Sequence, residues 1–132
     1  LPIPSTVEGK ALFDASLPAR DFVFGEIGED KKATRMVRRG DYKFIYYPCG
    51  NVKQLFDLKN DPTESHDLAG DAAYAALLAE MEALMIPQLH GMDLDWVRDG
   101  RLVGYPAPEY RPTPNYGLYN QRGYHWPPPT QC

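Results

Sequence analysis

Residues 36–45 of the chain read MVRRGDYKFI, and residues 54–64 read QLFDLKNDPTE. The first stretch contains two β-rich runs joined at Gly40, and glycine adopts a positive φ without steric cost. The second stretch passes from a β-rich run into turn-forming residues, with Pro62 suited to the second position of a type I turn. Together the two stretches predict antiparallel strands that end near residue 60.

Four short β-rich runs lie between Asp21 and Leu58, and tight turns separate the last three of them. The expected strands are residues 22–27, 33–39, 42–48 and 54–58. Gly40 and Gly50 supply the glycines for the two tight turns. In the third run, Tyr42, Phe44 and Tyr46 share one face and Lys43, Ile45 and Tyr47 the other. Neither face is strongly polar, so we expect both faces of the sheet to be partly covered.

A single long helix is expected after the strands. Asp71 is a good N-cap, and apolar residues then recur at i, i+4 spacing. Pro87 predicts that the helix stops or kinks near residues 85–86, and Gly91 marks a definite end. The expected fold class is therefore α+β, a four-stranded antiparallel sheet with one long helix packed on it. The apolar stripe consists of Ala73, Leu77, Met81 and Leu84, with Tyr74, Leu78 and Met85 beside it.

The chain divides into three expected segments. Residues 1–20 contain three prolines and are expected to form a linker or arm, and residues 21–91 form the α+β domain. Residues 92–132 are expected to form an extended C-terminal arm. Residues 98–132 hold 7 of the 13 prolines and 5 of the 9 tyrosines, too many prolines for regular ladders and too many rings for a free tail. We expect this arm to dock on a larger protein or on a second copy of the chain.

Composition restricts the classes of protein to which the chain can belong. Its 132 residues suit one domain, and its 43% apolar content suits a soluble globular protein. The net charge of −4 argues against a nucleic-acid partner, and no apolar run reaches the roughly 20 residues that a membrane helix needs. The sequence begins without a recognisable signal peptide, and it leaves the compartment open between cytoplasm and periplasm.

A run of basic residues is one candidate site. Six of the 14 basic side chains fall within residues 31–43, and Arg35 and Arg38 are the candidate contacts to substrate or to a domain interface. The alternative is a solvated strand edge, where basic side chains prevent pairing with other chains.

A second candidate contact is the aromatic group Tyr124, His125 and Trp126, which could line a pocket or anchor a subunit contact. The alternative is that these rings cover the domain's own apolar surface. No catalytic or metal-binding residue is predicted. The three histidines are scattered, and neither acidic set, Asp57, Asp61 and Glu64 or Asp93, Asp95 and Asp99, has the spacing of a calcium loop.

The two quoted stretches, followed by Asp67-Leu68-Ala69, resemble the C-terminal signature of sulfatases. That family commonly shows an R-x-G-x-Y-K-hydrophobic strand and then L-[YF]-D-L-x-x-D-P-x-E-x-x-N-L, and order and spacing agree here. Asp67 stands where the family usually has Asn, and it could still brace the turn. The resemblance covers about residues 1–86 and implies the family's small domain, an antiparallel sheet with a helix across it.

The resemblance also implies a function. Sulfatases hydrolyse sulfate esters with a formylglycine, made from the Cys of a Cys-x-Pro-x-Arg motif, beside a calcium ion. Neither Cys49 nor Cys132 lies in such a motif. We therefore expect the C-terminal domain of a sulfuric ester hydrolase, which completes the fold and shapes the substrate entrance. The formylglycine and calcium would belong to an N-terminal catalytic domain of the same polypeptide, and this chain alone would be inactive.

Two alternatives stay open at the level of sequence. The same small domain occurs in phosphonate monoester and phosphodiester hydrolases of the alkaline phosphatase superfamily, which differ mainly in the active site. The chain could instead be an autonomous interaction module without a catalytic partner. A homo-oligomer formed through the tail is compatible with each of these functions.

Overall fold

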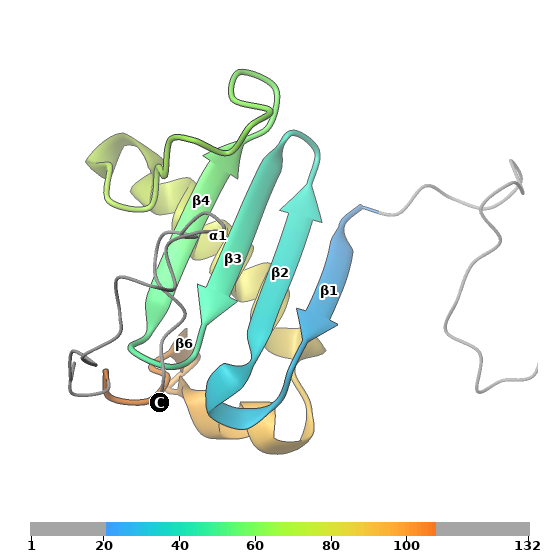
Figure 1. The fold of residues 1–132 in the computed structure, drawn as a ribbon, viewed down its shortest axis with the longest axis vertical. Coiled ribbons are helices and arrows are strands. Elements are labelled where there is room, and N and C mark those ends of the chain that lie inside the picture. Colours follow the sequence, from blue (N-terminus) through green and yellow to red (C-terminus); the bar gives the residue numbers. More distant parts are fainter. Residues whose placement is uncertain (1–20, 108–132) are drawn as a thin grey trace, which may run out of the picture.

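The computed structural model describes residues 21–107. The expected arm, residues 1–20, and the tail from residue 108 onward lie outside this range. The sheet consists of β1 (Val23–Ile27), β2 (Thr34–Arg39), β3 (Tyr42–Tyr47) and β4 (Val52–Asp57). They are ordered β1-β2-β3-β4 and each neighbouring pair is antiparallel (Figure 1). The expected four-stranded antiparallel sheet is thus confirmed.

The turns between the strands use the residues that the sequence indicated. Gly40 has φ 57° and joins β2 to β3, and Gly50 has φ 80° between β3 and β4. Asn51 also adopts a positive φ of 50°, which makes this turn tight. Pairing therefore resumes at Val52 opposite Tyr47, so the expected start of the fourth strand at residue 54 is wrong by two residues.

One continuous helical segment follows the sheet, over residues 72–88. It comprises the 3₁₀ turn η2 (Ala72–Tyr74), α1 (Ala75–Met85) and the 3₁₀ turn η3 (Ile86–Gln88). The Asp71 carboxylate accepts a hydrogen bond of 2.9 Å from the Ala73 N–H, which confirms the predicted cap. Because the first turn is 3₁₀, the 3.6-residue period begins only in α1, and Ala73 is exposed rather than part of the stripe.

The core lies between the sheet and this helix, which crosses one face of the sheet (Figure 1). Successive strand residues point to opposite faces, and the buried sheet residues lie on the helix side except Phe56, which is 5% exposed on the other face. Met81 and Met85 of α1 are at most 1% exposed. The sheet contributes Val37, Phe44, Tyr46 and Leu55 to the core, and the other segments contribute Leu68, Leu89, Trp96 and Leu102.

The structure differs from expectation at residues 92–107, which were assigned to the extended arm. They form the 3₁₀ turn η4 (Gly91–Trp96) and a hairpin of β5 (Val97–Arg98) and β6 (Arg101–Leu102). Trp96 is fully buried in the domain core, so the packed domain extends past the expected boundary at residue 91. Asp99 and Gly100 both have positive φ, as a type I′ turn requires, and this Asp-Gly pair is the hairpin signal that the proline count obscured.

The packing predicts a large difference between two methionines. We expect Met81→Ala to lower the free energy of unfolding by about 2–5 kcal/mol, because it leaves a cavity under the sheet. Met92→Ala is the matched control, since the Met92 side chain is 55% exposed and its truncation should cost under about 0.5 kcal/mol. Denaturant unfolding of the two variants checks this, and equal losses would contradict the assigned core.

Candidate functional site

The motif that carries the family resemblance folds into a loop organised by carboxylates. The Asp57 side chain accepts hydrogen bonds from the N–H groups of Lys59 and Asn60, at 3.0 and 3.2 Å. The Asp61 side chain accepts 3.0 Å bonds from the hydroxyls of Thr63 and Ser65, and a 2.8 Å bond from the His66 N–H. These acids therefore hold turns, which agrees with the structural roles expected for them.

Asp67 connects this loop to the sheet. Its Oδ1 accepts 3.0 Å hydrogen bonds from the N–H groups of Leu55 in β4 and of Ala69. The Leu68 N–H donates to the Leu55 carbonyl at 2.8 Å. The loop therefore returns along the outer edge of β4 and satisfies backbone groups that an edge strand would leave open. The expected bracing role of Asp67 is confirmed.

Asp61 gives a pH prediction. Hydrogen bonds from the backbone at His66 and Ser65, and then from the side chains of Ser65 and Thr63, lower its pKa from 3.8 to about 2. A lowered pKa in the folded state means that the carboxylate stabilises the loop above pH 3.8, and that this stabilisation is lost as the pH falls towards 2. NMR titration should show the His66 amide shifting with a midpoint near 2, and a midpoint near 3.8 would contradict the geometry. In Asp61→Asn this transition should be absent.

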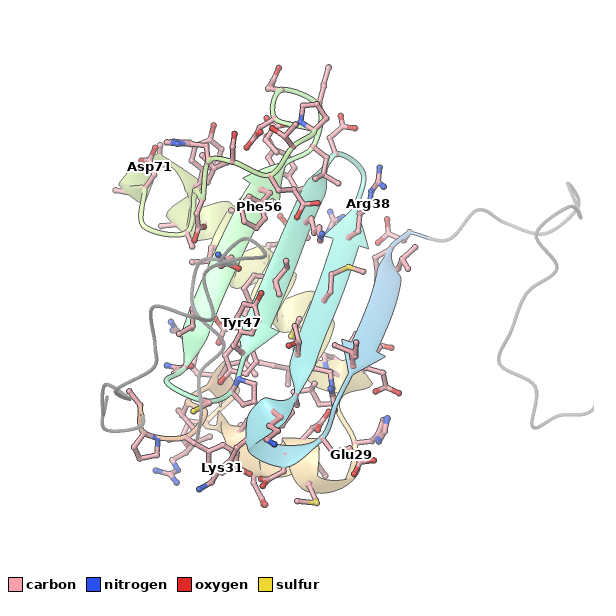
Figure 2. The ribbon with its side chains drawn as sticks, in the orientation of Figure 1. Glu29, Lys31, Arg38, Tyr47, Phe56 and Asp71 are labelled. Carbon is pink, nitrogen blue, oxygen red and sulfur yellow. The ribbon has the colours of Figure 1, made fainter. Side chains whose placement is uncertain are left out.

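The basic residues of the 31–43 run do not form one patch. Figure 2 shows Lys31 at one end of the sheet and Arg38 near the other. Lys43 Nζ binds both carboxylate oxygens of Glu64, at 2.8 and 2.7 Å. Arg39 lies 2.7 Å from a carboxylate oxygen of Glu80. With Arg35, which binds Asp93, three of the six basic side chains are paired with acids, and this favours ordinary structural roles over a single anion site.

Arg35, one of the two candidate contacts in this run, is buried on the helix side of the sheet. It forms a two-point ion pair with Asp93, with Nε–Oδ2 2.7 Å and Nη2–Oδ1 2.9 Å. Its Nη1 donates to the carbonyls of Ile27, Gly28 and Thr34. The guanidinium carbon also lies 5.3 Å from the centroid of the Trp96 ring. Every nitrogen of the side chain thus has an internal acceptor, and its role here is to fasten η4 to the sheet.

A second buried acid, Glu82, links the helix to two other elements. Its Oε2 lies 2.7 Å from Lys53 Nζ of β4, and its Oε1 accepts a 2.7 Å hydrogen bond from the Leu102 N–H of β6. Sequence analysis identified neither Asp93 nor Glu82. Each lies about 20 to 60 residues from its partner along the chain, and no local pattern indicates such pairs.

The Arg35–Asp93 pair predicts that the loss of one partner destabilises the domain more than the replacement of both. Asp93→Asn should lower the free energy of unfolding by about 3–5 kcal/mol, because it leaves a buried guanidinium without its counter-charge. Replacing both partners, as Arg35→Met with Asp93→Leu, should cost less than the single change. Asp95→Asn is the control, since Asp95 is exposed on the same 3₁₀ turn. Thermal or chemical unfolding checks this, and a single variant as stable as the control would contradict it.

The opposite face of the sheet carries an apolar surface that α1 does not cover. Strand alternation and register place on it the apolar residues Val23, Gly25, Ile27, Met36, Ile45, Tyr47, Val52 and Phe56, and among them the polar residues Thr34, Arg38, Lys43 and Gln54. We call this set the open face. Val23 is 47% and Ile27 72% exposed. Burial, with the charges of Glu64 and Asp67, raises the pKa of Tyr47. An antiparallel sheet usually has one polar, solvated face, so an apolar second face indicates a contact surface.

Arg38, the other candidate contact, belongs to this face. Figure 2 shows it on β2, with Tyr47 and Phe56 on the two following strands. It is exposed, and its Nε donates to the Gly40 carbonyl at 3.3 Å. Among residues 21–107 no carboxylate forms an ion pair with it. Arg38 and Arg35 thus point to opposite faces of β2 and cannot form one site. Tyr124, His125 and Trp126 lie outside the described residues.

The Cys-x-Pro-x-Arg motif that the family resemblance implies does not occur in the sequence. Cys49 is followed by Gly-Asn-Val rather than by the x-Pro-x-Arg that formylglycine formation needs, and it is fully buried. Across residues 21–107 no group of three or more His, Cys, Asp or Glu residues is placed to hold a metal ion. The same range contains no helix long and apolar enough to cross a bilayer. A formylglycine and its calcium therefore do not fit this part of the chain.

Two curated proteins are similar in sequence. A Δ4,5-hexuronate-2-O-sulfatase of Bacteroides thetaiotaomicron is 47% identical over 51 residues, which is 39% of this chain and 11% of that protein. An arylsulfatase of Clostridium perfringens is 29% identical over 112 residues, 80% of this chain and 23% of that protein. The chain thus spans less than a quarter of the length of either relative. No protein-family model matches the sequence.

Solved structures agree with the sequence comparison. A 2-O GAG sulfatase superposes with a TM-score of 0.60 and 30% identity, over 67% of this chain and 21% of that one. A protein solved with its substrate D-glucosamine-2-N,6-O-disulfate has a TM-score of 0.57 over 67% of this chain and 20% of its own. Its identity of 24% supports the fold alone.

The sheet, the crossing helix and the carboxylate-organised loop define a small α+β domain. The curated relatives are sulfatases, as is the solved structure that shares 30% identity, and the chain has the fold of a sulfatase C-terminal domain.

Proposed function

We propose that the chain is the C-terminal domain of a sulfuric ester hydrolase, and that its open face docks on a catalytic domain in the same polypeptide. The observation that carries this proposal is the apolar second face of the sheet, on a chain that matches less than a quarter of each curated sulfatase. A face of this kind gains free energy when another surface removes it from water. The catalytic domain would supply the formylglycine and calcium, and this domain would complete the fold and shape the substrate entrance.

The proposed role of the open face follows from where the rigid parts of the domain lie. Arg35 and Asp93 fix η4 at one end of the sheet, and the loop around Asp61 is fixed at the other. Arg38, exposed on the open face, is the residue proposed to contact the catalytic domain or its substrate. Tyr124, His125 and Trp126 remain predicted contacts of the tail, as does a homo-oligomer formed through it.

The substrate class proposed is an O-sulfated sugar. The relative with the highest identity among those described above is a hexuronate 2-O-sulfatase, and a 2-O GAG sulfatase shares the fold at 30% identity. None of the relatives described above is a phosphonate or phosphodiester hydrolase. A phosphate diester assayed beside the sulfate esters separates the two chemistries directly.

Activity measurements test the proposal. The chain of 132 residues alone should not hydrolyse a chromogenic aryl sulfate, whereas the parent protein should hydrolyse that ester or a 2-O-sulfated uronic acid. Turnover by the chain alone that tracks its concentration through purification would overturn the assigned role. A parent that cleaves a phosphate diester but neither sulfate ester would establish the alternative chemistry.

Two surface variants test the docking face in the parent protein. Ile27→Glu places a charge on the open face and should lower the melting temperature and the kcat/KM for a sulfate ester, because burying an unpaired carboxylate at an interface costs several kcal/mol. Leu94→Glu is the matched control, because Leu94 is 57% exposed on η4, away from the open face. Equal behaviour of the two variants would show that the open face is not an interface.

A further inference from the structure

The strand β1 lies at an edge of the sheet, and its two edges differ from those of the inner strands. Among residues 21–107 it pairs with β2 alone, and Figure 1 shows it at one margin of the sheet. At the other margin, the loop at Asp67 and Leu68 bonds the outer edge of β4. Within the described residues, the chain therefore closes one edge of its sheet and leaves the edge at β1 open.

The register identifies which backbone groups point outward from β1. A two-residue turn joins β2 to β3, so the pair that closes it, Arg39 and Tyr42, is hydrogen-bonded. Hydrogen-bonded and non-bonded pairs alternate along antiparallel strands, so residues 34, 36 and 38 bond their partners in β1, residues 27, 25 and 23. The N–H and C=O groups of Phe24 and Glu26 therefore point away from β2. The same alternation turns Leu55 of β4 outward, in agreement with its bonds to the covering loop.

The strand β1 lacks the features that usually prevent pairing at an edge. Its sequence, Val-Phe-Gly-Glu-Ile, contains no proline or lysine, and its five residues pair with β2 without a bulge. Val23 and Ile27 are β-branched and are 47% and 72% exposed on the open face. An edge strand of this kind is suited to accept an extended segment, which adds a strand to the sheet through backbone hydrogen bonds.

The surroundings of β1 indicate the charge of a matching strand. A cleft of about 760 Å³ lies at the end of β1, and it is lined by four carboxylates, one guanidinium and one imidazole. The guanidinium, that of Arg35, is already paired with Asp93. Glu26 on the strand and Glu29 after it are exposed carboxylates of this cleft. Because like charges on facing strands are destabilising, the excess of acids favours a basic partner over an acidic one.

We propose that β1 accepts an extended, basic segment of the catalytic domain as a fifth strand of the sheet. This rests on the proposed function, because it states how the catalytic domain attaches beside the open face. Successive side chains of the added strand alternate between the faces. Those on the open face pack beside Val23 and Ile27, and basic ones on the helix side meet Glu26 and the cleft. A second copy of β1 is a poor partner, because it brings the same acids together.

Hydrogen exchange resolved at single residues tests the added strand. In the 132-residue chain alone, the amides of Phe24 and Glu26 should exchange quickly, whereas that of Gly25, which bonds β2, should exchange slowly. In the parent protein, Phe24 and Glu26 should exchange at least about tenfold more slowly than in the chain alone, because a strand now bonds them. Fast exchange of both amides in the parent would overturn the proposal. Slow exchange in the chain alone, as a monomer or as a dimer, would also overturn it.

Proline variants separate backbone pairing from side-chain contact. Glu26→Pro removes an outward N–H and no bond to β2, and an edge strand tolerates proline at such a position. It should lower the melting temperature of the parent by at least about 2 °C more than that of the chain alone. Glu26→Gln is the matched control, since it removes the charge but keeps the N–H, and it should have the smaller effect. Gly25→Pro removes a bond to β2 and should destabilise both proteins. Equal shifts for Glu26→Pro in the parent and in the chain alone would refute the added strand.

A charge reversal tests the basic character of the segment. Glu29→Lys should lower the melting temperature of the parent but not that of the chain alone, because it places a cation beside the basic strand. Asp41→Lys is the control, since Asp41 is exposed in the turn between β2 and β3, away from the cleft. Equal melting temperatures of the two variant parents would show that the partner is not basic.

Turnover of a sulfate ester by the parent is measured separately, so that the two proposals can fail independently. Fast exchange at Phe24 and Glu26 in a parent that hydrolyses the ester would overturn the added strand and leave the proposed function. Slow exchange in a parent that hydrolyses no sulfate ester would support the added strand and overturn the proposed chemistry.

Discussion

The ion pair between Arg35 and Asp93 is the interaction on which the far end of this domain depends. Its two hydrogen bonds, 2.7 and 2.9 Å long, are shielded from water and stacked against Trp96. A buried charge is tolerated only when its partners are complete, so β2 and η4 must be assembled together. Once η4 is fixed, the β5–β6 hairpin and the strand-like contact of Tyr105 with the β3–β4 turn have a defined place.

At the other end of the sheet, neutral donors surround the acids Asp57, Asp61 and Asp67, beside the partly exposed Lys43–Glu64 ion pair. Asp57 accepts hydrogen bonds from N–H groups, and Asp61 from an N–H and two hydroxyl groups, all within a few residues, whereas Asp67 bonds the edge of β4. These local bonds need no distant partner, which explains why the sulfatase-like motif is compact in sequence. The domain therefore combines a loop that folds locally with a core fastened across long stretches of chain.

This arrangement gives the two faces of the sheet different roles. The helix face contains the buried ionic and aromatic contacts that hold the domain together. The open face carries apolar residues and the exposed Arg38, and α1 lies on the opposite side of the sheet. In the proposed function, the open face docks on a catalytic domain of the same polypeptide, and the helix face keeps the domain rigid.

The sequence by itself determined the four strands, the turns at Gly40 and Gly50, the Asp71 cap, the helix end before Pro87 and the family resemblance. All of these depend on residues within a few positions of one another, where backbone preference and side-chain capping act directly. Only the tertiary structure decided that Arg35 binds Asp93, that Glu82 joins three elements and that Trp96 belongs to the core. Those contacts join residues far apart in the chain, and their free energy exists only after the sheet, helix and hairpin have excluded water from between them.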